Sequence, residues 1–350
     1  MNTGLRIDGR LVGSRQRTLV IAEIGVNHDG SVQRALELVR HAANAGADAV
    51  KFQIFRASTL VHPSSGLAEY QKGRVSEDDP ARMLRQYELS MEQLGTIVQA
   101  VRELRMTPLA TPFSPEDVDT IEALKLPAIK IASPDLVNRL LLARAAGTGK
   151  PLIISTGAAT MQEVEETVEW LGQMRVHFVL MHCVSSYPTP AYQAHLCWIN
   201  ELGKFQCPVG YSDHTTELLA GALAVSAGAC VIEKHLTYDR RAKGPDHSAS
   251  ADPVEFAEYV RLIRMAEAMR GAGSKHVLPI ERDVRTVSRQ SLVLARDVQP
   301  GQVLKISDLT VQRPGTGIAP ADIAAAAGRA AKYALPRGTL LQWDMLTDAA

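Results

Sequence analysis

The sequence has no excess of charge of either sign, because its 350 residues include 38 Lys and Arg and 38 Asp and Glu. A chain with no net charge has no overall electrostatic attraction for polyanions, so we do not expect it to bind nucleic acid or an anionic membrane. A local basic cluster can still hold a small anion. Cysteine is also scarce. The four cysteines form no C-x-x-C pair and lie in apolar surroundings, which favours free thiols in a reducing compartment.

Long apolar runs are missing as well. The first twenty residues contain four arginines and no continuous apolar stretch, so they do not resemble a signal peptide. The longest apolar stretch, 218–232, is too short to span a bilayer and is interrupted by two glycines. We therefore expect a cytoplasmic protein with no membrane partner.

What remains is the composition of an ordinary globular protein, with 46% hydrophobic and 22% charged residues. Short β-rich runs alternate with segments that begin with helix caps, such as Ser90 with Gln93 and Thr160 with Glu163. The β-rich runs predict eight strands, at 18–24, 49–55, 107–111, 128–132, 151–155, 176–183, 208–211 and 230–235.

Eight such units in about 250 residues predict a (β/α)8 TIM barrel. A doubly wound sheet would have fewer strands and a Gly-rich first turn, and no G-x-G-x-x-G follows the first run. After a helix at 253–270 the segment GAGSKHVLP reads as a linker. We expect a barrel domain at 1–272, a linker at 273–286 and a small second domain at 287–350.

Polar residues gather at the carboxyl ends of the predicted strands, where TIM barrels build their active sites. Lys51, Lys130 and Glu233 stand inside apolar runs, where an unpaired charge would be costly, and this favours a functional role. Alternation along a strand puts Glu233 and His235 on one face, whereas Lys234 points outward toward the helices.

Two kinds of ligand suit these residues. His214 and His235 end neighbouring strands and could share a divalent metal, although a satisfied core histidine or a general base is an equally open interpretation of either one. Lys51 and Lys130, together with strand-end hydroxyls, could hold a small anion that carries a phosphate and a carboxylate.

A set of motifs then carries a resemblance to a known family. In order along the chain they are IAEIGVNHDG, ADAVKFQIF, TPFSPED, IKIAS, IISTGAAT, HCVSSYPTP, GYSDHT, EKHLT, GPDHSAS and RPGTGI. Over roughly residues 18–345 the chain resembles the bacterial N-acetylneuraminate (sialic acid) synthase family, including its legionaminic acid synthase relatives. The resemblance implies a barrel followed by a small antifreeze-like (SAF) domain.

The resemblance also implies an activity, that of a transferase that forms a carbon–carbon bond. Phosphoenolpyruvate would condense with an open-chain N-acetylmannosamine-type sugar, with C–O cleavage, to give a nine-carbon 2-keto acid and phosphate. Manganese, or another divalent metal such as magnesium or cobalt, would be held by His214 and His235. A domain-swapped homodimer is implied as well, in which Arg313 of one chain serves the site of the other.

The remaining roles are carried over motif by motif. Proton transfer and stabilisation of positive charge would fall to Glu23, Glu233 and Asp246. The phosphoenolpyruvate contacts would be Lys51, Thr111, Lys130, Ser133, Ser155, Ser185 and Ser212. The sugar contacts would be Gln53, Tyr70, Gln71, Tyr187 and Arg313.

Several alternatives stay open at this point. Ser185 stands where some neuraminate synthases carry Asn, so the chain could instead be a legionaminic acid synthase that uses 2,4-diacetamido-2,4,6-trideoxymannose. Pseudaminic acid synthases fit HCVSSYPTP less well. Outside the family, Lys130 or Lys51 could form a Schiff base in an aldolase, or the chain could be a catalytically silent sugar-binding protein.

Overall fold

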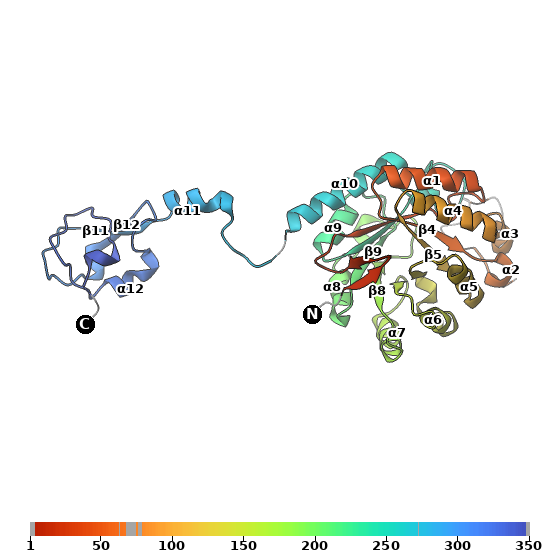
Figure 1. The fold of residues 1–350 in the computed structure, drawn as a ribbon, viewed down its shortest axis with the longest axis horizontal. Coiled ribbons are helices and arrows are strands. Elements are labelled where there is room, and N and C mark those ends of the chain that lie inside the picture. The colour runs from red at the N-terminus through yellow and green to blue at the C-terminus, as the bar shows by residue number, and fades with distance from the viewer. Residues whose placement is uncertain (1–3, 63, 68–74, 76–78, 272, 348–350) are drawn as a thin grey trace. The chain divides into compact units, whose positions relative to one another are not determined.

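A computed structural model describes residues 4–347 except 63, 68–74, 76–78 and 272 (Figure 1). The chain divides into two compact units, Met1–Ala272 and Gly273–Ala350. None of the helices in the described part of the chain is long and apolar enough to cross a membrane.

The first unit is a closed barrel of eight parallel strands, which confirms the predicted (β/α)8 fold. The strands follow one another around the barrel in chain order, and the last pairs with the first to close it. Their bounds are β3 Leu19–Glu23, β4 Ala49–Ile54, β5 Thr107–Pro112, β6 Ile129–Ile131, β7 Leu152–Ser155, β8 Phe178–Cys183, β9 Val209–Asp213 and β10 Val231–His235.

Helices connect and cover these strands (Figure 1). The predicted caps are present: the Ser90 and Thr160 side chains accept hydrogen bonds from the backbone of their own first turns, and both complete capping boxes. The helices of this unit are α1 Val32–Asn44, α2 Ala57–Leu60, α3 Pro80–Arg85, α4 Met91–Glu103, α5 Pro115–Ala123, α6 Arg139–Ala146, α7 Met161–Gln173, α8 Trp198–Leu202, α9 Ala220–Ser226 and α10 Pro253–Arg270.

The inside of the barrel changes character along its axis, because alternate side chains of every strand point inward. Near the N-terminal ends of the strands the inner positions form one apolar cluster, which includes Leu19, Ile21, Ala49, Leu109, Ala128, Ile153, Val179, Met181 and Val231. Two residues after Ile21 and Val231 the inward positions hold Glu23 and Glu233, which are buried. An apolar layer therefore underlies a polar one.

A short hairpin precedes the barrel and was not predicted from the sequence. Its strands, β1 Leu5–Ile7 and β2 Arg10–Val12, pair antiparallel. Leu5, Ile7 and Val12 belong to the same buried cluster as the inner apolar layer of the barrel. The hairpin thus covers the N-terminal end of the barrel. It escaped prediction because strands of three residues are too short to give a periodic signal.

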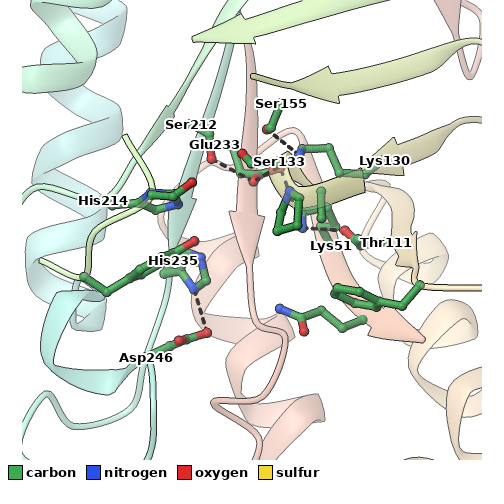
Figure 2. A pocket seen from close by; sticks show the side chains of 16 residues that line it. Lys51, Thr111, Lys130, Ser133, Ser155, Ser212, His214, Glu233, His235 and Asp246 are labelled. Carbon is green, nitrogen blue, oxygen red and sulfur yellow. Dashed lines mark hydrogen bonds and ion pairs between the residues drawn. The ribbon is translucent and has the colours of Figure 1, made fainter. Parts of the chain in front are cut away.

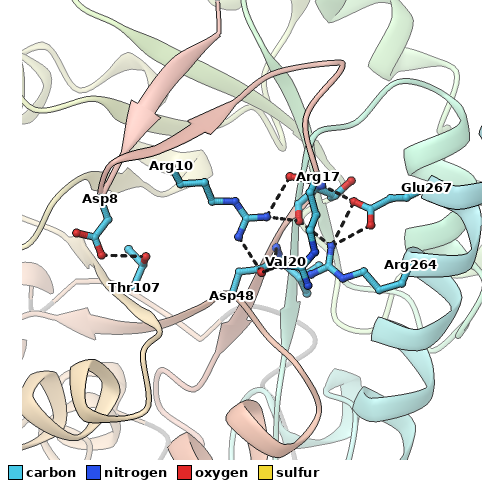
Figure 3. A network of polar contacts seen from close by, with 9 residues as sticks. Asp8, Arg10, Arg17, Val20, Asp48, Thr107, Arg264 and Glu267 are labelled. Atoms are coloured by element: carbon cyan, nitrogen blue, oxygen red, sulfur yellow. Dashed lines mark hydrogen bonds and ion pairs between the residues drawn. The ribbon is translucent and has the colours of Figure 1, made fainter. Parts of the chain in front are cut away.

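Asp48 ties this end of the barrel together (Figure 3). Its carboxylate accepts hydrogen bonds from Arg10 at 2.7 Å, from the backbone of Val20 at 2.9 Å and from Arg264 of α10 at 2.6 Å. Arg17 adds an ion pair at 2.7 Å. Burial alone would raise the pKa of Asp48, but these hydrogen bonds and positive charges outweigh it and hold the pKa below its ordinary value.

The second unit is smaller and has its own apolar core, which includes Leu292, Leu294, Leu304 and Leu341. Two strands, β11 Ser291–Leu294 and β12 Leu309–Gln312, pair antiparallel, and isolated bridges add further pairings such as Val298 with Leu335. Its helices are α11 Arg282–Ser288 and α12 Ile323–Ala326.

We predict that Asp48→Asn lowers the free energy of unfolding by about 2–4 kcal/mol at pH 7, because it removes one member of a nearly buried charge network. A depressed carboxyl pKa gives stability that is present above the unfolded pKa of about 3.9 and is lost as the pH falls through the folded value. In urea unfolding experiments, the difference between wild type and variant should therefore shrink from pH 7 to pH 3.

Asp119→Asn is the matched control, because Asp119 pairs with Arg144 with 64% of its side chain exposed, against 6% for Asp48. Its cost should stay below about 1 kcal/mol. Equal losses for the two variants at pH 7 would show that the Asp48 network is not a structural tie.

Candidate active site

A cavity of about 380 Å³ opens at the C-terminal end of the barrel, where the strands turn into their loops (Figure 2). Most of its lining consists of polar side chains contributed by different strands. The lining residues are Lys51, Gln53, Thr111, Phe113, Lys130, Ala132, Ser133, Pro134, Ser155, Ser185, Tyr187, Ser212, His214, Glu233, His235 and Asp246.

The structure brings nearly all of the described sequence-predicted residues of the barrel to this one cavity. Glu23 is the exception, since it does not line the cavity but forms an ion pair with Lys51, which does. Tyr70 and Gln71 lie outside the described residues. Arg313 follows β12 in the second unit and is exposed there.

Two buried lysines and Glu233 form the centre of the site. Lys51 Nζ lies 3.8 Å from Glu233 Oε2 and donates to Thr111 Oγ1 at 2.8 Å. Lys130 Nζ lies 3.9 Å from Glu233 Oε1 and donates to Ser155 Oγ at 2.6 Å. Two ammonium groups with neighbouring hydroxyls can hold an anion that carries two acidic groups.

Burial and the neighbouring charges shift the pKa values of these lysines and carboxylates in different directions. Burial would raise the pKa of Glu233, but Lys130 and Lys51 outweigh it and lower that pKa. Burial likewise opposes the charge of Lys51, yet Glu23 and Glu233 raise its pKa. For Lys130 burial wins and lowers the pKa. Burial, with the like charge of Glu233 adding to it, raises the pKa of Glu23 despite the opposing charge of Lys51.

The two histidines lie beside this centre with their ring centroids 5.6 Å apart. His214 Nδ1 donates to the carbonyl of Val184 at 2.8 Å, which leaves Nε2 unprotonated. Burial lowers the pKa of His214 to about 4 and also lowers that of His235 well below its ordinary value. Both imidazoles are therefore neutral at pH 7 and can act as ligands.

The nitrogen and oxygen donors on the histidine side of the cavity suit a divalent metal. His235 Nδ1 is buried without a hydrogen-bond partner and lies 3.6 Å from Asp246 Oδ2. Within the described ranges, no group of three or more His, Cys, Asp or Glu side chains is placed to hold a metal ion. Two neutral imidazoles, one with an unsatisfied buried nitrogen, fit an ion that takes its remaining ligands from substrate and water.

Gly157 lies against the hydroxyls on one side of the cavity, and the sequence analysis missed it. Its backbone N–H donates to Ser133 Oγ at 3.0 Å, and Ser133 Oγ lies 3.0 Å from Cys183 Sγ. A Cβ on Gly157 would lie 2.3 Å from Ser185 Oγ, 2.5 Å from the Cys183 sulfur and 2.8 Å from Ser133 Oγ. Only glycine allows this close packing.

Three further residues near strand ends were not among the predicted site residues. Phe113 lines the cavity, although only its position in TPFSPED, just after a strand, could have indicated this. Asp213 and His182 also sit at strand ends but point outward, because each alternates with an inward neighbour, Ser212 and Cys183.

Comparison with known proteins places these residues in a family context. The sequence pattern of the NeuB family matches residues 38–275. The chain belongs to the NeuB family. A SAF domain pattern matches residues 289–347, which confirms the predicted antifreeze-like domain.

Individual relatives of this NeuB family member match over most of their length. The N,N'-diacetyllegionaminic acid synthase of Legionella pneumophila is 40% identical, covering 98% of this chain and 99% of that protein. The enzyme of the same name from Campylobacter jejuni is 36% identical, covering 87% and 92%. The crystal structure of an N-acetylneuraminic acid (sialic acid) synthetase from Leptospira borgpetersenii, 30% identical, superposes with a TM-score of 0.73 over 80% of this chain and 94% of that one.

The resemblance implies that these hydroxyls contact phosphoenolpyruvate, and this ligand is therefore the probe for the next prediction. We predict that Gly157→Ala weakens its binding at least about tenfold, because the new methyl group must displace the hydroxyls of Ser133 and Ser185. Isothermal titration calorimetry would measure the dissociation constant. Gly172→Ala in α7 is the control, since nothing lies within 4 Å of the added Cβ, and it should bind like wild type. An unchanged dissociation constant for Gly157→Ala would contradict the prediction.

Proposed function

We propose that the chain condenses phosphoenolpyruvate with an open-chain N-acylated amino sugar to give a nine-carbon 2-keto acid and phosphate. The observation that carries this proposal is the pairing, in one cavity, of two buried lysines around Glu233 with two neutral histidines. Membership of a family of sialic-acid-type synthases supports the same reaction class.

The lysine side of the cavity would hold phosphoenolpyruvate. Lys51 and Lys130 supply two positive charges for its phosphate and carboxylate, and Thr111 and Ser155 hold the two ammonium groups in place. Ser133 and Ser185 add hydroxyls that can donate to the same oxygens. Ser212, the remaining predicted phosphoenolpyruvate contact, lines the cavity and donates its hydroxyl hydrogen to Glu233 Oε1 at 3.0 Å. The Gly157 N–H fixes the position of Ser133 from behind.

The histidine side would hold the sugar aldehyde. His214 and His235 would bind a divalent ion, manganese or a similar metal, which when bound supplies Lewis-acid polarisation of a carbonyl oxygen. Glu233 lies within 4 Å of both ammonium groups and can stabilise positive charge that develops on the substrate. Glu233 and Asp246 line the cavity and can take part in proton transfer, and Glu23 can do so through Lys51, with which it forms an ion pair. Gln53 and Tyr187 can contact the sugar.

Water balances the reaction. The enol carbon C3 forms the bond to the aldehyde carbon, water adds to C2, and the C2–O bond to phosphate breaks. The bridging oxygen therefore leaves with phosphate, and the keto oxygen comes from water.

A phosphate-release assay with phosphoenolpyruvate labelled with ¹⁸O in the bridging position tests the proposal. The acceptor panel should contain N-acetylmannosamine and 2,4-diacetamido-2,4,6-trideoxymannose. The second sugar is included because two relatives, 40% and 36% identical, are named N,N'-diacetyllegionaminic acid synthases. We expect sugar-dependent release of labelled phosphate.

Each rival gives a different outcome in this assay. Label retained in the 2-keto acid would contradict C–O cleavage. Borohydride trapping of a substrate on Lys130 or Lys51 would support an aldolase with a Schiff base. No release with any sugar on the panel, in the presence of manganese, would favour a sugar-binding protein without activity.

We predict strict dependence on a divalent metal. Excess chelator should abolish phosphate release and manganese should restore it, because two neutral imidazoles carry no charge of their own with which to polarise the aldehyde oxygen. His214→Ala and His235→Ala should each lower kcat/KM on the order of 10³-fold or more. Full turnover in excess chelator would contradict the proposed metal site at His214 and His235.

We also propose a domain-swapped homodimer in which Arg313 reaches the sugar in the partner's barrel across the linker 273–286. His235→Ala protein and Arg313→Ala protein, each inactive alone, should complement each other after subunit exchange. Every mixed dimer would then hold one intact site, and equal amounts should recover roughly a quarter of wild-type activity by symmetry. Mixed dimers that are confirmed by mass but inactive would rule out the swap.

A further inference from the structure

Another buried ion pair, separate from those of the cavity, lies on the outer face of the barrel wall behind the histidines. Lys234 of β10 and Asp213 of β9 are register partners on neighbouring strands. Lys234 Nζ lies 3.1 Å from Asp213 Oδ2, and the two residues are 2% and 0% exposed. Neither residue has a part in the reaction proposed above.

Both members of the pair make further hydrogen bonds. Asp213 accepts from the Tyr259 hydroxyl of α10 at 2.9 Å, from the Tyr211 hydroxyl at 3.2 Å and from the backbone N–H of Thr215 at 2.8 Å. Lys234 Nζ donates to the Thr215 carbonyl as well as to Asp213. The two charged side chains therefore bind each other and also the N–H and the carbonyl of Thr215.

Burying such a pair between strands and helices carries a large desolvation free energy. Two apolar side chains of similar volume are often as stable as a buried ion pair, or more stable. The outward residue Ile232, two positions before Lys234 on the same strand, is apolar and belongs to the main core. Stability alone thus gives no reason for charges at Lys234 and Asp213.

Their neighbours in the chain give a reason. His214 stands between Asp213 and Thr215, and both of these flanking residues are held by the network. His235 directly follows Lys234. The ion pair therefore fixes the backbone on both sides of one histidine and immediately before the other, and it sets the distance between the two strand ends.

We propose that Asp213 and Lys234 are positioning residues that hold His214 and His235 at the spacing a shared divalent ion requires. The inference rests on the proposed metal-dependent function. Outer residues that orient metal ligands typically contribute a factor of 10–100 in metal affinity. The network would act here through the backbone and would not touch the substrate.

The test is manganese binding to the purified full chain, followed by the electron paramagnetic resonance signal of free Mn²⁺. The double variant Asp213→Asn/Lys234→Met removes both charges while nearly keeping both volumes. We expect its manganese dissociation constant to rise about 10–100-fold. Phosphoenolpyruvate binding in chelator should stay within about twofold, because the Lys51 and Lys130 contacts are untouched.

The matched control is Asp48→Asn/Arg264→Met, which removes an ion pair at the opposite end of the barrel that also reaches α10. It should lower the unfolding temperature and leave the manganese dissociation constant within about twofold of wild type. Equal weakening of manganese binding in both double variants would reduce the effect to general stability and overturn the inference.

If the first double variant does not fold, Tyr259→Phe removes one hydrogen bond to Asp213 and keeps both charges. It should weaken manganese binding several-fold at a nearly unchanged unfolding temperature. Wild-type affinity in a folded Asp213→Asn/Lys234→Met protein, or failing that in Tyr259→Phe, would overturn the inference. A wild-type chain that binds no divalent metal would instead contradict the proposed function, and with it this inference.

Discussion

Two lysines inside a strand barrel require negative charge within a few ångströms, and this requirement organises the candidate site. Burial opposes the charge of both lysines. Glu23 and Glu233 outweigh it at Lys51 and offset only part of it at Lys130. Side-chain alternation makes the arrangement possible, because it turns the same face of several strands toward one point. The cavity is then polar at the ends of the strands and apolar beneath.

The two ends of the barrel carry different tasks. At the N-terminal end, Asp48 joins the hairpin, the first barrel strand and the last helix, and its charges serve cohesion. At the C-terminal end, Lys51 and Lys130 are held against hydroxyls that a ligand can share. This division suits a fold in which one face is used for stability and the other for chemistry.

Much of this could be predicted from the sequence, because period-two alternation is a local signal. It placed Glu233 and His235 inward and Lys234 outward, as the strand pairing and the buried contacts have them. What escaped prediction depends on contacts between distant segments. Gly157 matters only because Ser133 and Ser185 approach it, and the hairpin is recognisable only by the core it joins.

The hairpin determines from which end ligands can enter and leave the cavity. Its apolar side chains are buried with the innermost residues at the N-terminal ends of the strands. The cavity is therefore blind at that end, and whatever enters or leaves must pass the loops at the other. A molecule that enters must displace water through the same opening, and two ligands that share the cavity must enter and leave through it in turn.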